Sequence, residues 1–203
     1  MAIRNIVFDI GNVLLDFCWE KYLKELGFTG ETFERVARAT VKDPLWNEMD
    51  RGVMSYEELL SGFIANDPGV KSEILKMMED LGGLVETQPY TKPWLWQLKE
   101  DGYRVYALSN FSEKCYTEAG AKMDFLELMD GSILSYREKL IKPDQAIFRL
   151  LCDRFSLVPA ECVFMDDTKA NTDAAVRFGM HAFVFRSRES AVEELKRLGV
   201  KTG

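Results

Sequence analysis

The sequence predicts an α/β protein built on a Rossmann-like parallel sheet, with a helical subdomain inserted into it. From residue 91 onward, short apolar runs of strand length alternate with amphipathic helical segments. This order is typical of parallel strands whose connecting helices cover the faces of a sheet. At the start of the chain, Ile6, Val7 and Phe8 form a continuous apolar run, which suits a strand buried on both faces. Between these two parts no strand signal interrupts the helical patterns, so an insertion is predicted there.

The first predicted strand covers residues 3–8 and ends on Asp9, after which Gly11 and Asn12 turn the chain. Later strands are predicted at residues 103–108, 132–135, 162–165 and 182–185. Helices are predicted around them, at residues 93–99, 113–121, 145–155, 169–178 and 191–198. Because the carboxyl ends of parallel strands meet at the same edge of a sheet, we expect the loops after these strands to lie together.

The inserted stretch is predicted to form a small helical subdomain. Its helices are expected at residues 19–26, 33–40, 55–64 and 70–81, from apolar residues that recur at helical spacing. Ser55 and Glu58 have the spacing of a capping box at the start of the third helix. We therefore expect a Rossmann-like core, residues 1–17 and 84–203, and a helical subdomain, residues 18–83.

Composition limits the kind of partner that this protein can have. The chain has 203 residues, of which 47% are hydrophobic, enough to bury the core of one domain with an insertion. It has 26 Lys and Arg residues and 33 Asp and Glu residues, and the basic residues are scattered along the chain. This balance argues against nucleic acid as the main partner. A phosphorylated small molecule remains compatible, because one metal ion and one lysine can reverse the local field.

Cysteine usage and hydropathy indicate the expected compartment. The four cysteines (Cys18, Cys115, Cys152 and Cys162) show no C-x-x-C pairing, which fits isolated thiols in a reducing environment. The N-terminal apolar run is short and ends at Asp9, unlike a signal peptide, and no apolar run has the length of a membrane span. We expect a cytoplasmic protein that does not enter the membrane, and the sequence predicts no oligomeric state.

Several polar residues follow predicted strands and converge on the same sheet edge. They are Asp9, Ser109, Asn110, Lys142, Asp166 and Asp167. Taken singly, each is typical of a turn, a helix cap or a solvated loop. Together they supply a carboxylate nucleophile, hydroxyl and amide donors, a cation and a pair of carboxylates. These groups are the parts needed to hold a phosphoryl group and a hard divalent cation.

The order and spacing of these motifs resemble a known family. D-x-G-N at Asp9 is followed by S-N at Ser109, K-P at Lys142 and D-D-x-x-x-N ending at Asn171, so the motifs span most of the chain. This set is similar to the haloacid dehalogenase superfamily. Within it, the chain resembles bacterial sugar-phosphate phosphatases of the α-D-glucose-1-phosphate phosphatase type. These carry a small helical cap between the first and second motifs, where this chain has its insertion.

The resemblance implies a role for each catalytic group. Asp9 would attack phosphorus and form an aspartyl-phosphate, which divides hydrolysis into two steps. Ser109 and the backbone amide of Asn110 would bind the non-bridging phosphate oxygens. Lys142 would neutralise charge on both the nucleophile and the phosphoryl group. The implied activity is hydrolysis of small phosphorylated metabolites, with sugar phosphates as the expected class.

The resemblance also implies a Mg²⁺ cofactor. Its ligands would be the carboxylates of Asp9 and Asp166 and the carbonyl of Gly11, since Mg²⁺ prefers oxygen ligands. Asp167 would either hold metal-bound water or orient Lys142, and Asn171 would support this arrangement.

One position departs from the wider superfamily. Most of its phosphatases carry a second aspartate two residues after the nucleophile as general acid and base, and Gly11 stands there in this chain. The proton donor is therefore unassigned, and Asp16 is a nearby candidate. The absence of this second aspartate is also compatible with a metal-independent 2-haloacid dehalogenase. Such an enzyme, however, gains nothing from Asp166 and Asp167 beside its anionic substrate. A sugar-phosphate-binding protein without turnover is a third alternative.

Other conspicuous residues have simpler interpretations. A gap is predicted between two cap helices at Trp46, Glu48 and Arg51. These residues either contact the non-phosphate part of a substrate or form an ordinary surface loop. Trp94 and Trp96 are predicted to be packing residues on an amphipathic helix. His181, the single histidine, is expected to have no catalytic role.

Overall fold

The predicted parallel sheet is present in the computed structural model, which describes residues 2–202. From one edge to the other, its strands are β5 (Gly131–Leu134), β4 (Arg104–Ser109), β1 (Asn5–Phe8), β6 (Cys162–Asp166) and β7 (His181–Val184). Each strand is parallel to its neighbours, and Phe8 pairs with Ala107 on β4 and with Met165 on β6. Because β1 is central, the residue that follows it lies at the middle of the carboxyl edge.

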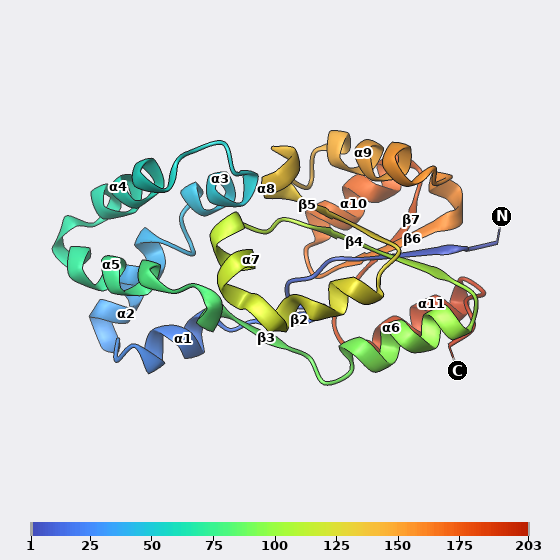
Figure 1. The fold of residues 1–203 in the computed structure, drawn as a ribbon, viewed down its shortest axis with the longest axis horizontal. Coiled ribbons are helices and arrows are strands. Elements are labelled where there is room, and N and C mark those ends of the chain that lie inside the picture. The colour runs from blue at the N-terminus through green and yellow to red at the C-terminus, as the bar shows by residue number, and fades with distance from the viewer. Residues whose placement is uncertain (1, 203) are drawn as a thin grey trace.

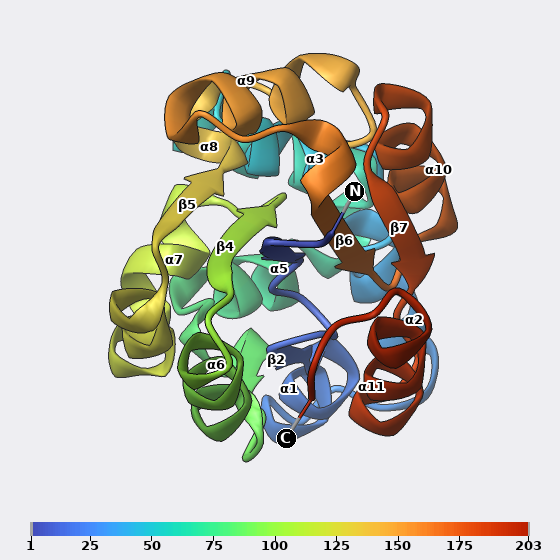
Figure 2. The same ribbon diagram turned by 90° about the vertical axis from the view of Figure 1, so that its right-hand side faces the viewer.

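Helices cover both faces of the sheet, as Figure 2 shows in a view along the molecule. One face is covered by α6 (Thr91–Glu100) and α11 (Arg188–Arg197), and the other by α9 (Gln145–Phe155) and α10 (Lys169–Phe178). The side chains of β1 alternate between them. Ile6 and Phe8 join the hydrophobic cluster of α6 and α11, whereas Val7 joins that of α9 and α10. The continuous apolar run at the start of the sequence is explained by this two-sided burial.

The inserted segment is helical, and its helices lie together at one end of the molecule (Figure 1). They are α1 (Trp19–Glu25), α2 (Gly30–Ala39), α3 (Leu45–Arg51), α4 (Tyr56–Asn66) and α5 (Lys71–Glu79). The predicted capping box at the start of α4 is confirmed. The Glu58 amide donates to Ser55 Oγ at 3.2 Å, and the Ser55 amide donates to Glu58 Oε2 at 2.8 Å. These bonds satisfy two amide groups that would otherwise lack a partner.

The prediction of a gap between helices around Trp46, Glu48 and Arg51 is wrong, because these residues form α3. Asp43 Oδ1 accepts a hydrogen bond from the Leu45 amide at 2.9 Å at the start of this helix. The helix has only 7 residues, which is too short for apolar residues at helical spacing to form a recognisable pattern. Trp46 and Met49 are its buried side chains.

Two short strands that the sequence analysis missed form a separate ribbon where the chain leaves and re-enters the core. β2 (Leu15–Phe17) and β3 (Val85–Thr87) are antiparallel, with Asp16 opposite Glu86. Each has only three residues, too few for an alternation pattern to be visible. The ribbon ties together the two ends of the inserted segment.

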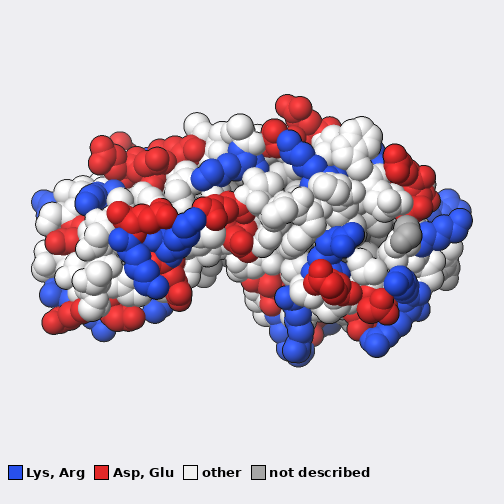
Figure 3. All heavy atoms as spheres, turned by 90° about the horizontal axis from the view of Figure 1, so that it is seen from below, with Lys and Arg blue, Asp and Glu red and all other residues white. Residues whose placement is uncertain are grey.

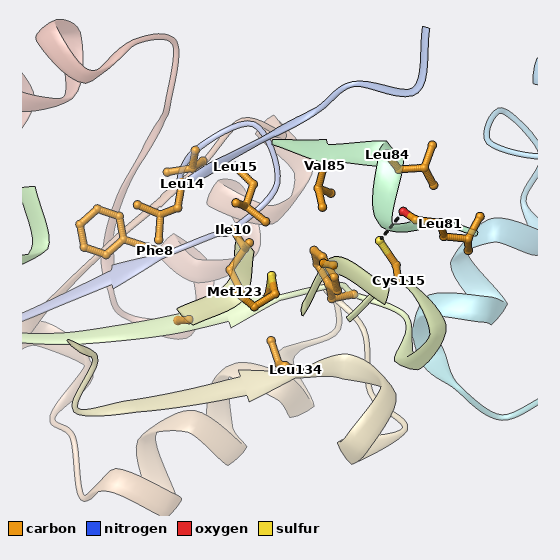
Figure 4. Close-up of a cluster of buried hydrophobic side chains, with 14 of the residues drawn as sticks. Phe8, Ile10, Leu14, Leu15, Leu81, Leu84, Val85, Cys115, Met123 and Leu134 are labelled. Carbon is orange, nitrogen blue, oxygen red and sulfur yellow. Dashed lines mark hydrogen bonds between the residues drawn. The ribbon is translucent and has the colours of Figure 1, made fainter. Parts of the chain in front are cut away.

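Hydrophobic packing continues from the sheet into the inserted segment. Figure 4 shows Phe8 of β1, Leu15 and Val85 of the ribbon, and Leu81 near the end of α5 in one cluster. Cys115 on α7 (Glu113–Ala119) donates its thiol to the Leu81 carbonyl at 3.7 Å. Because one apolar cluster spans both parts, the position of the helices over the sheet edge is set by packing.

The remaining elements are short. The structure also contains α8 (Ser135–Glu138) after β5 and the 3₁₀ segments η1 (Pro68–Val70), η2 (Gly82–Leu84), η3 (Gly120–Leu128) and η4 (Pro159–Glu161). On the face seen in Figure 3, basic and acidic side chains are interspersed.

Of residues 2–202, none belongs to a helix with the length and apolar character needed to cross a membrane.

The two tryptophans of α6 allow a test of the core. Trp94 is 2% exposed and its ring lies 5.1 Å from that of Phe8, whereas Trp96 is 55% exposed, so the packing prediction holds for Trp94 and is wrong for Trp96. Trp94→Ala should lower the free energy of unfolding by about 3–5 kcal/mol, because it leaves a large cavity. Trp96→Ala, the matched control, should change it by less than about 0.5 kcal/mol. Urea titration measures both, and equal losses would contradict the packing described.

Candidate active site

The sheet topology brings the predicted site residues together. Asp9 follows β1, Ser109 ends β4 and Asp166 ends β6, and these strands are neighbours. Lys142 reaches the same edge from the loop between α8 and α9. These four side chains are in contact with one another, although they are far apart in the sequence.

The Lys142 ammonium lies between two buried carboxylates. Its Nζ is 2.8 Å from Asp9 Oδ1 and 2.6 Å from Asp166 Oδ2. Lys142 is 3% exposed and Asp166 is 0% exposed, so solvent screens neither pair. Burial alone would lower the pKa of Lys142, but the two carboxylates outweigh this effect and raise it above its usual value. The lysine is therefore a permanent cation within the site.

Asp9 is oriented by hydrogen bonds to one of its two oxygens. Oδ1 accepts from the Ile10 amide and from Ser109 Oγ, each at 2.7 Å. Within residues 2–202, these hydrogen bonds and the ion pair with Lys142 all involve Oδ1 and leave Oδ2 without one. Burial, reinforced by the neighbouring Asp166 carboxylate, raises the pKa of Asp9 to about 7, and Lys142 opposes this shift.

Asn110 has a contact that the sequence did not predict. Its Oδ1 accepts from the Lys142 amide at 2.8 Å, and its Nδ2 donates to the Lys142 carbonyl at 3.0 Å. The side chain thus clamps the backbone that carries the buried ammonium. We predicted only that its backbone amide binds phosphate. The side-chain contact joins residues 32 positions apart, so no local sequence pattern could reveal it.

The carboxylates form a cluster suited to a cation. One oxygen each of Asp9, Asp166 and Asp167 lies within 4.8 Å of the others. Asn171 Nδ2 is 3.0 Å from both oxygens of Asp166, as a supporting role would require. Asp167 lies nearer to the cluster than predicted, and Asn12 Nδ2 donates to its Oδ2 at 2.8 Å.

A cavity of about 220 Å³ opens above Asp9. Its lining comes from the strand loops, from the ribbon β2–β3 and from α3: Asp9, Gly11, Asn12, Phe17, Trp46, Asp50, Val85, Ser109, Asn110, Phe111, Ser112, Cys115, Asp167 and Thr168. The space is large enough for a small metabolite and is reached by groups of both the core and the inserted segment. A cavity beside a fixed carboxylate is a candidate ligand site.

Of the inserted-segment residues singled out in the sequence, Trp46 lines this cavity. Glu48 and Arg51 instead form an ion pair with each other, Nε to Oε2 at 3.2 Å. Asp16 lies on β2, where Gln88 Nε2 donates to its carboxylate at 2.5 Å, and it is not among the lining residues. His181 is exposed at the start of β7 and is not among the lining residues.

Asp50 is a cavity residue that the sequence analysis overlooked. It lies on α3, and burial together with the negative charge of Asp9 raises its pKa to about 7. Its only sequence signal was its place beside Arg51 and Gly52, in a segment for which substrate contact and an ordinary loop were both left open.

A family model of haloacid dehalogenase-like hydrolases matches residues 3–179. The chain belongs to this family. A HAD family enzyme of Bacteroides thetaiotaomicron, solved in complex with magnesium and inorganic phosphate, has the same fold, with a TM-score of 0.70 and 21% identity over 92% of this chain and 96% of that one. The predicted family and fold class are thus confirmed.

Three curated relatives differ in their named activities. Acyl-CoA dehydrogenase family member 10 of Mus musculus is 27% identical over 96% of this hydrolase, but the chain spans only 19% of that protein. D-ribitol-5-phosphate phosphatase of Bacteroides thetaiotaomicron is 27% identical over 89% of the chain and 91% of the relative. (S)-2-haloacid dehalogenase 4A of Burkholderia cepacia is 29% identical over 89% of the chain and 81% of the relative.

The buried lysine gives a direct test of the site. Lys142→Met should lower the free energy of unfolding by about 3–5 kcal/mol near neutral pH in the presence of chelator, because it leaves Asp9 and Asp166 without a buried counter-ion. Lys169→Met is the matched control, since Lys169 forms an exposed ion pair with Asp173 and should contribute about 0–1 kcal/mol. Urea titration compares the two variants. A loss for Lys142→Met no larger than that of the control would show that the ion triad is not formed.

Proposed function

We propose that this hydrolase cleaves phosphomonoesters of small metabolites, with Asp9 as the nucleophile. The observation that carries the proposal is the Asp9 carboxylate, held through Oδ1 by Ser109 and Lys142 at the base of a cavity. A fixed carboxylate beside a permanent cation is suited to attack an anionic, electrophilic phosphorus. The similarity to D-ribitol-5-phosphate phosphatase over most of both chains supports this reaction class.

The residues act in two steps. Oδ2 of Asp9 forms a bond to phosphorus while the bond from phosphorus to the ester oxygen breaks, which gives an aspartyl-phosphate and an alcohol. Ser109 and the Asn110 backbone amide hold the non-bridging oxygens, and Lys142 balances the charge that gathers there. Water then attacks phosphorus, which releases phosphate and restores the Asp9 carboxylate.

The same residues fit a Mg²⁺ cofactor. The clustered donors at Asp9, Asp166 and Asp167 are all oxygens, the ligand type that Mg²⁺ prefers. The Gly11 carbonyl, beside the cavity, is a further candidate ligand. When bound, the cation would neutralise phosphate charge and orient the phosphoryl group. Magnesium and inorganic phosphate in the related Bacteroides enzyme support this cofactor.

The inserted segment would act as a cap that reads the rest of the substrate. We assign residues 18–83 to the cap and residues 1–17 and 84–203 to the catalytic core. Trp46 on α3 lines the cavity and offers an aromatic surface to a sugar ring. Sugar phosphates are the substrate class that we favour, because their size suits a cavity of about 220 Å³.

The competing reaction is hydrolytic dehalogenation, which the similarity to (S)-2-haloacid dehalogenase 4A favours. That chemistry uses the same aspartate on carbon without a metal. The carboxylates of Asp166 and Asp167 near Asp9 would repel a haloacid anion, whereas a Mg²⁺ site requires them. The cluster therefore favours the phosphatase.

A screen of sugar phosphates and nucleotides, with and without Mg²⁺, tests the reaction, and Asp9→Asn tests the mechanism. This variant keeps the size of the side chain but removes the attacking charge, so phosphate release should fall by about 10³-fold or more. Asp173→Asn, at an aspartate paired with Lys169 on the surface, should retain full activity. Residual activity of Asp9→Asn within about tenfold of wild type would exclude a covalent step on Asp9. Binding without phosphate release would indicate a non-enzymatic role.

Metal binding can be measured separately by thermal denaturation. Saturating Mg²⁺ should raise the Tm of the wild type by roughly 5–10 °C, because it relieves repulsion among the clustered carboxylates. Asp166→Asn should lose most of this rise, while Asp173→Asn should keep it. If Asp166→Asn responds to Mg²⁺ as the wild type does, the cation binds elsewhere. If chelator leaves hydrolysis unchanged, the metal-independent dehalogenase becomes the better interpretation.

A further inference from the structure

Expulsion of an alcohol from a phosphomonoester requires a proton for the departing oxygen, unless the leaving group is itself acidic. The core loop offers no carboxyl group two residues after Asp9, since Gly11 stands there. Asp16, the candidate from the sequence, is hydrogen-bonded to Gln88 on the ribbon side and is not among the residues that line the cavity. A proton donor must therefore come from another part of the lining.

The lining contains one acidic side chain from the inserted segment. Besides Asp9, its carboxylates are Asp167, which belongs to the candidate metal cluster, and Asp50 on α3. Within the described chain, no hydrogen bond joins Asp50 to Asp9, although both border the same cavity. The space between them is available to a substrate.

Stereochemistry places the leaving group on the side of α3. In phosphoryl transfer the attacking and departing oxygens lie roughly in line on opposite sides of phosphorus. Asp9 attacks from the sheet edge, where Ser109 and Lys142 hold it. The departing oxygen therefore points away from the sheet, toward the wall that contributes Trp46 and Asp50.

The backbone of Asp50 is attached to the core. The Ser135 hydroxyl donates to the Asp50 carbonyl at 2.6 Å and accepts from the Phe111 amide at 2.8 Å. It thereby connects α3 to the loop that follows Ser109. Gly52 strengthens this attachment: it has a φ of +70°, and a Cβ there would lie 2.9 Å from the Tyr136 carbonyl oxygen. This close approach of α3 to α8 is possible only for glycine.

We propose that Asp50 is the general acid and base of this enzyme, an inference that rests on the proposed phosphatase function. As Asp9 Oδ2 bonds to phosphorus, the ester P–O bond breaks and its electron pair passes to the leaving oxygen. That oxygen takes the proton of the Asp50 carboxyl group and departs as an alcohol. In the second step the Asp50 carboxylate accepts a proton from the attacking water, so both aspartates regain their starting states.

The ionisation of Asp50 is consistent with this role. Burial and the charge of Asp9 raise its pKa to about 7, against Lys142 and the Ser112 amide, which lower it. A carboxylic acid with a pKa near neutral pH is suited both to donate and to accept a proton there. The other ionisable groups on α3, and on the helices α4 and α8 that pack against it, are Glu48, Arg51, Tyr56, Glu57, Glu58, Tyr136, Arg137 and Glu138. Lys139 follows α8, and Cys115 on α7 is also influenced by the charge of Asp50.

The decisive experiment measures aspartyl-phosphate formation in single turnovers, with Mg²⁺, on phosphate esters of graded leaving-group pKa. With esters of basic alcohols, Asp50→Asn should lower the rate of aspartyl-phosphate formation by about 10²–10⁴-fold. With aryl phosphates, whose leaving groups are acidic, the rate should be nearly unchanged. The leaving-group dependence should therefore be shallow in the wild type and steep in the variant. Glu48→Gln on the same helix, and Asp16→Asn on the ribbon, should both retain the shallow dependence.

Each other outcome overturns the assignment. A uniform loss across all esters in Asp50→Asn would indicate a structural or binding role, and a steep dependence in Asp16→Asn would make Asp16 the acid. If the wild type already shows the steep dependence, the site has no general acid. If the wild type releases phosphate from none of the esters, the proposed function itself fails.

A stability measurement tests the environment of Asp50 without turnover. In the folded protein its pKa of about 7 lies above the ordinary value of 3.8, so the folded state retains a proton that the unfolded state loses between these values. The wild type should therefore lose stability as pH rises through this window. Asp50→Asn should incur a smaller loss, because only Asp9, whose pKa is also raised to about 7, still titrates there. In chelator, the Tm of Asp50→Asn should exceed that of the wild type by several degrees at mildly alkaline pH and equal it in acid. A pH-independent difference would show that Asp50 titrates normally.

Discussion

A single ammonium group between two carboxylates holds the active site together. Lys142 contacts Asp9 after β1 and Asp166 at the end of β6, and Asn110 after β4 clamps its backbone. Three neighbouring strand ends are thus connected through one cation. Because burying an ion triad costs more desolvation free energy than an apolar cluster of the same size, its stability alone would not explain its presence. A functional role explains it better, since Lys142 opposes the rise in the pKa of Asp9 and holds this carboxylate, our proposed nucleophile, in place.

The sheet and its carboxyl edge could be predicted because their signals are local. The apolar run at Ile6–Phe8, the turn at Gly11, and the alternation of strands and helices each arise within a few residues. Parallel topology then requires the strand ends to meet, so Asp9, Ser109 and Asp166 could be placed at one edge before any distance was known. Lys142 could be added only through its motif, because its loop position alone has no structural signature.

What the sequence did not reveal depends on contacts between distant segments. The side chain of Asn110 binds the backbone of Lys142, and the ribbon of β2 and β3 exists only because residues 15–17 meet residues 85–87. The same limitation applies to Asp50, which enters the cavity through the docking of α3 on α8. A short helix with an acidic residue is common on surfaces, so no local pattern distinguished it from Glu48 beside it. Only tertiary packing separates a cavity acid from a solvated one.

The room around Gly11 has an evolutionary consequence. A Cβ at this position would meet no atom of the described residues within 4 Å, so the backbone here does not require glycine for lack of space. Two of the four glycine codons become aspartate codons by one base change in the second position, and the other two become glutamate codons. A lineage could thus acquire a core-borne acid while Asp50 was still present, and pass through a form with two proton donors rather than none. Once the donor lay in the core, α3 would be free to diverge toward new substrates without loss of the chemistry.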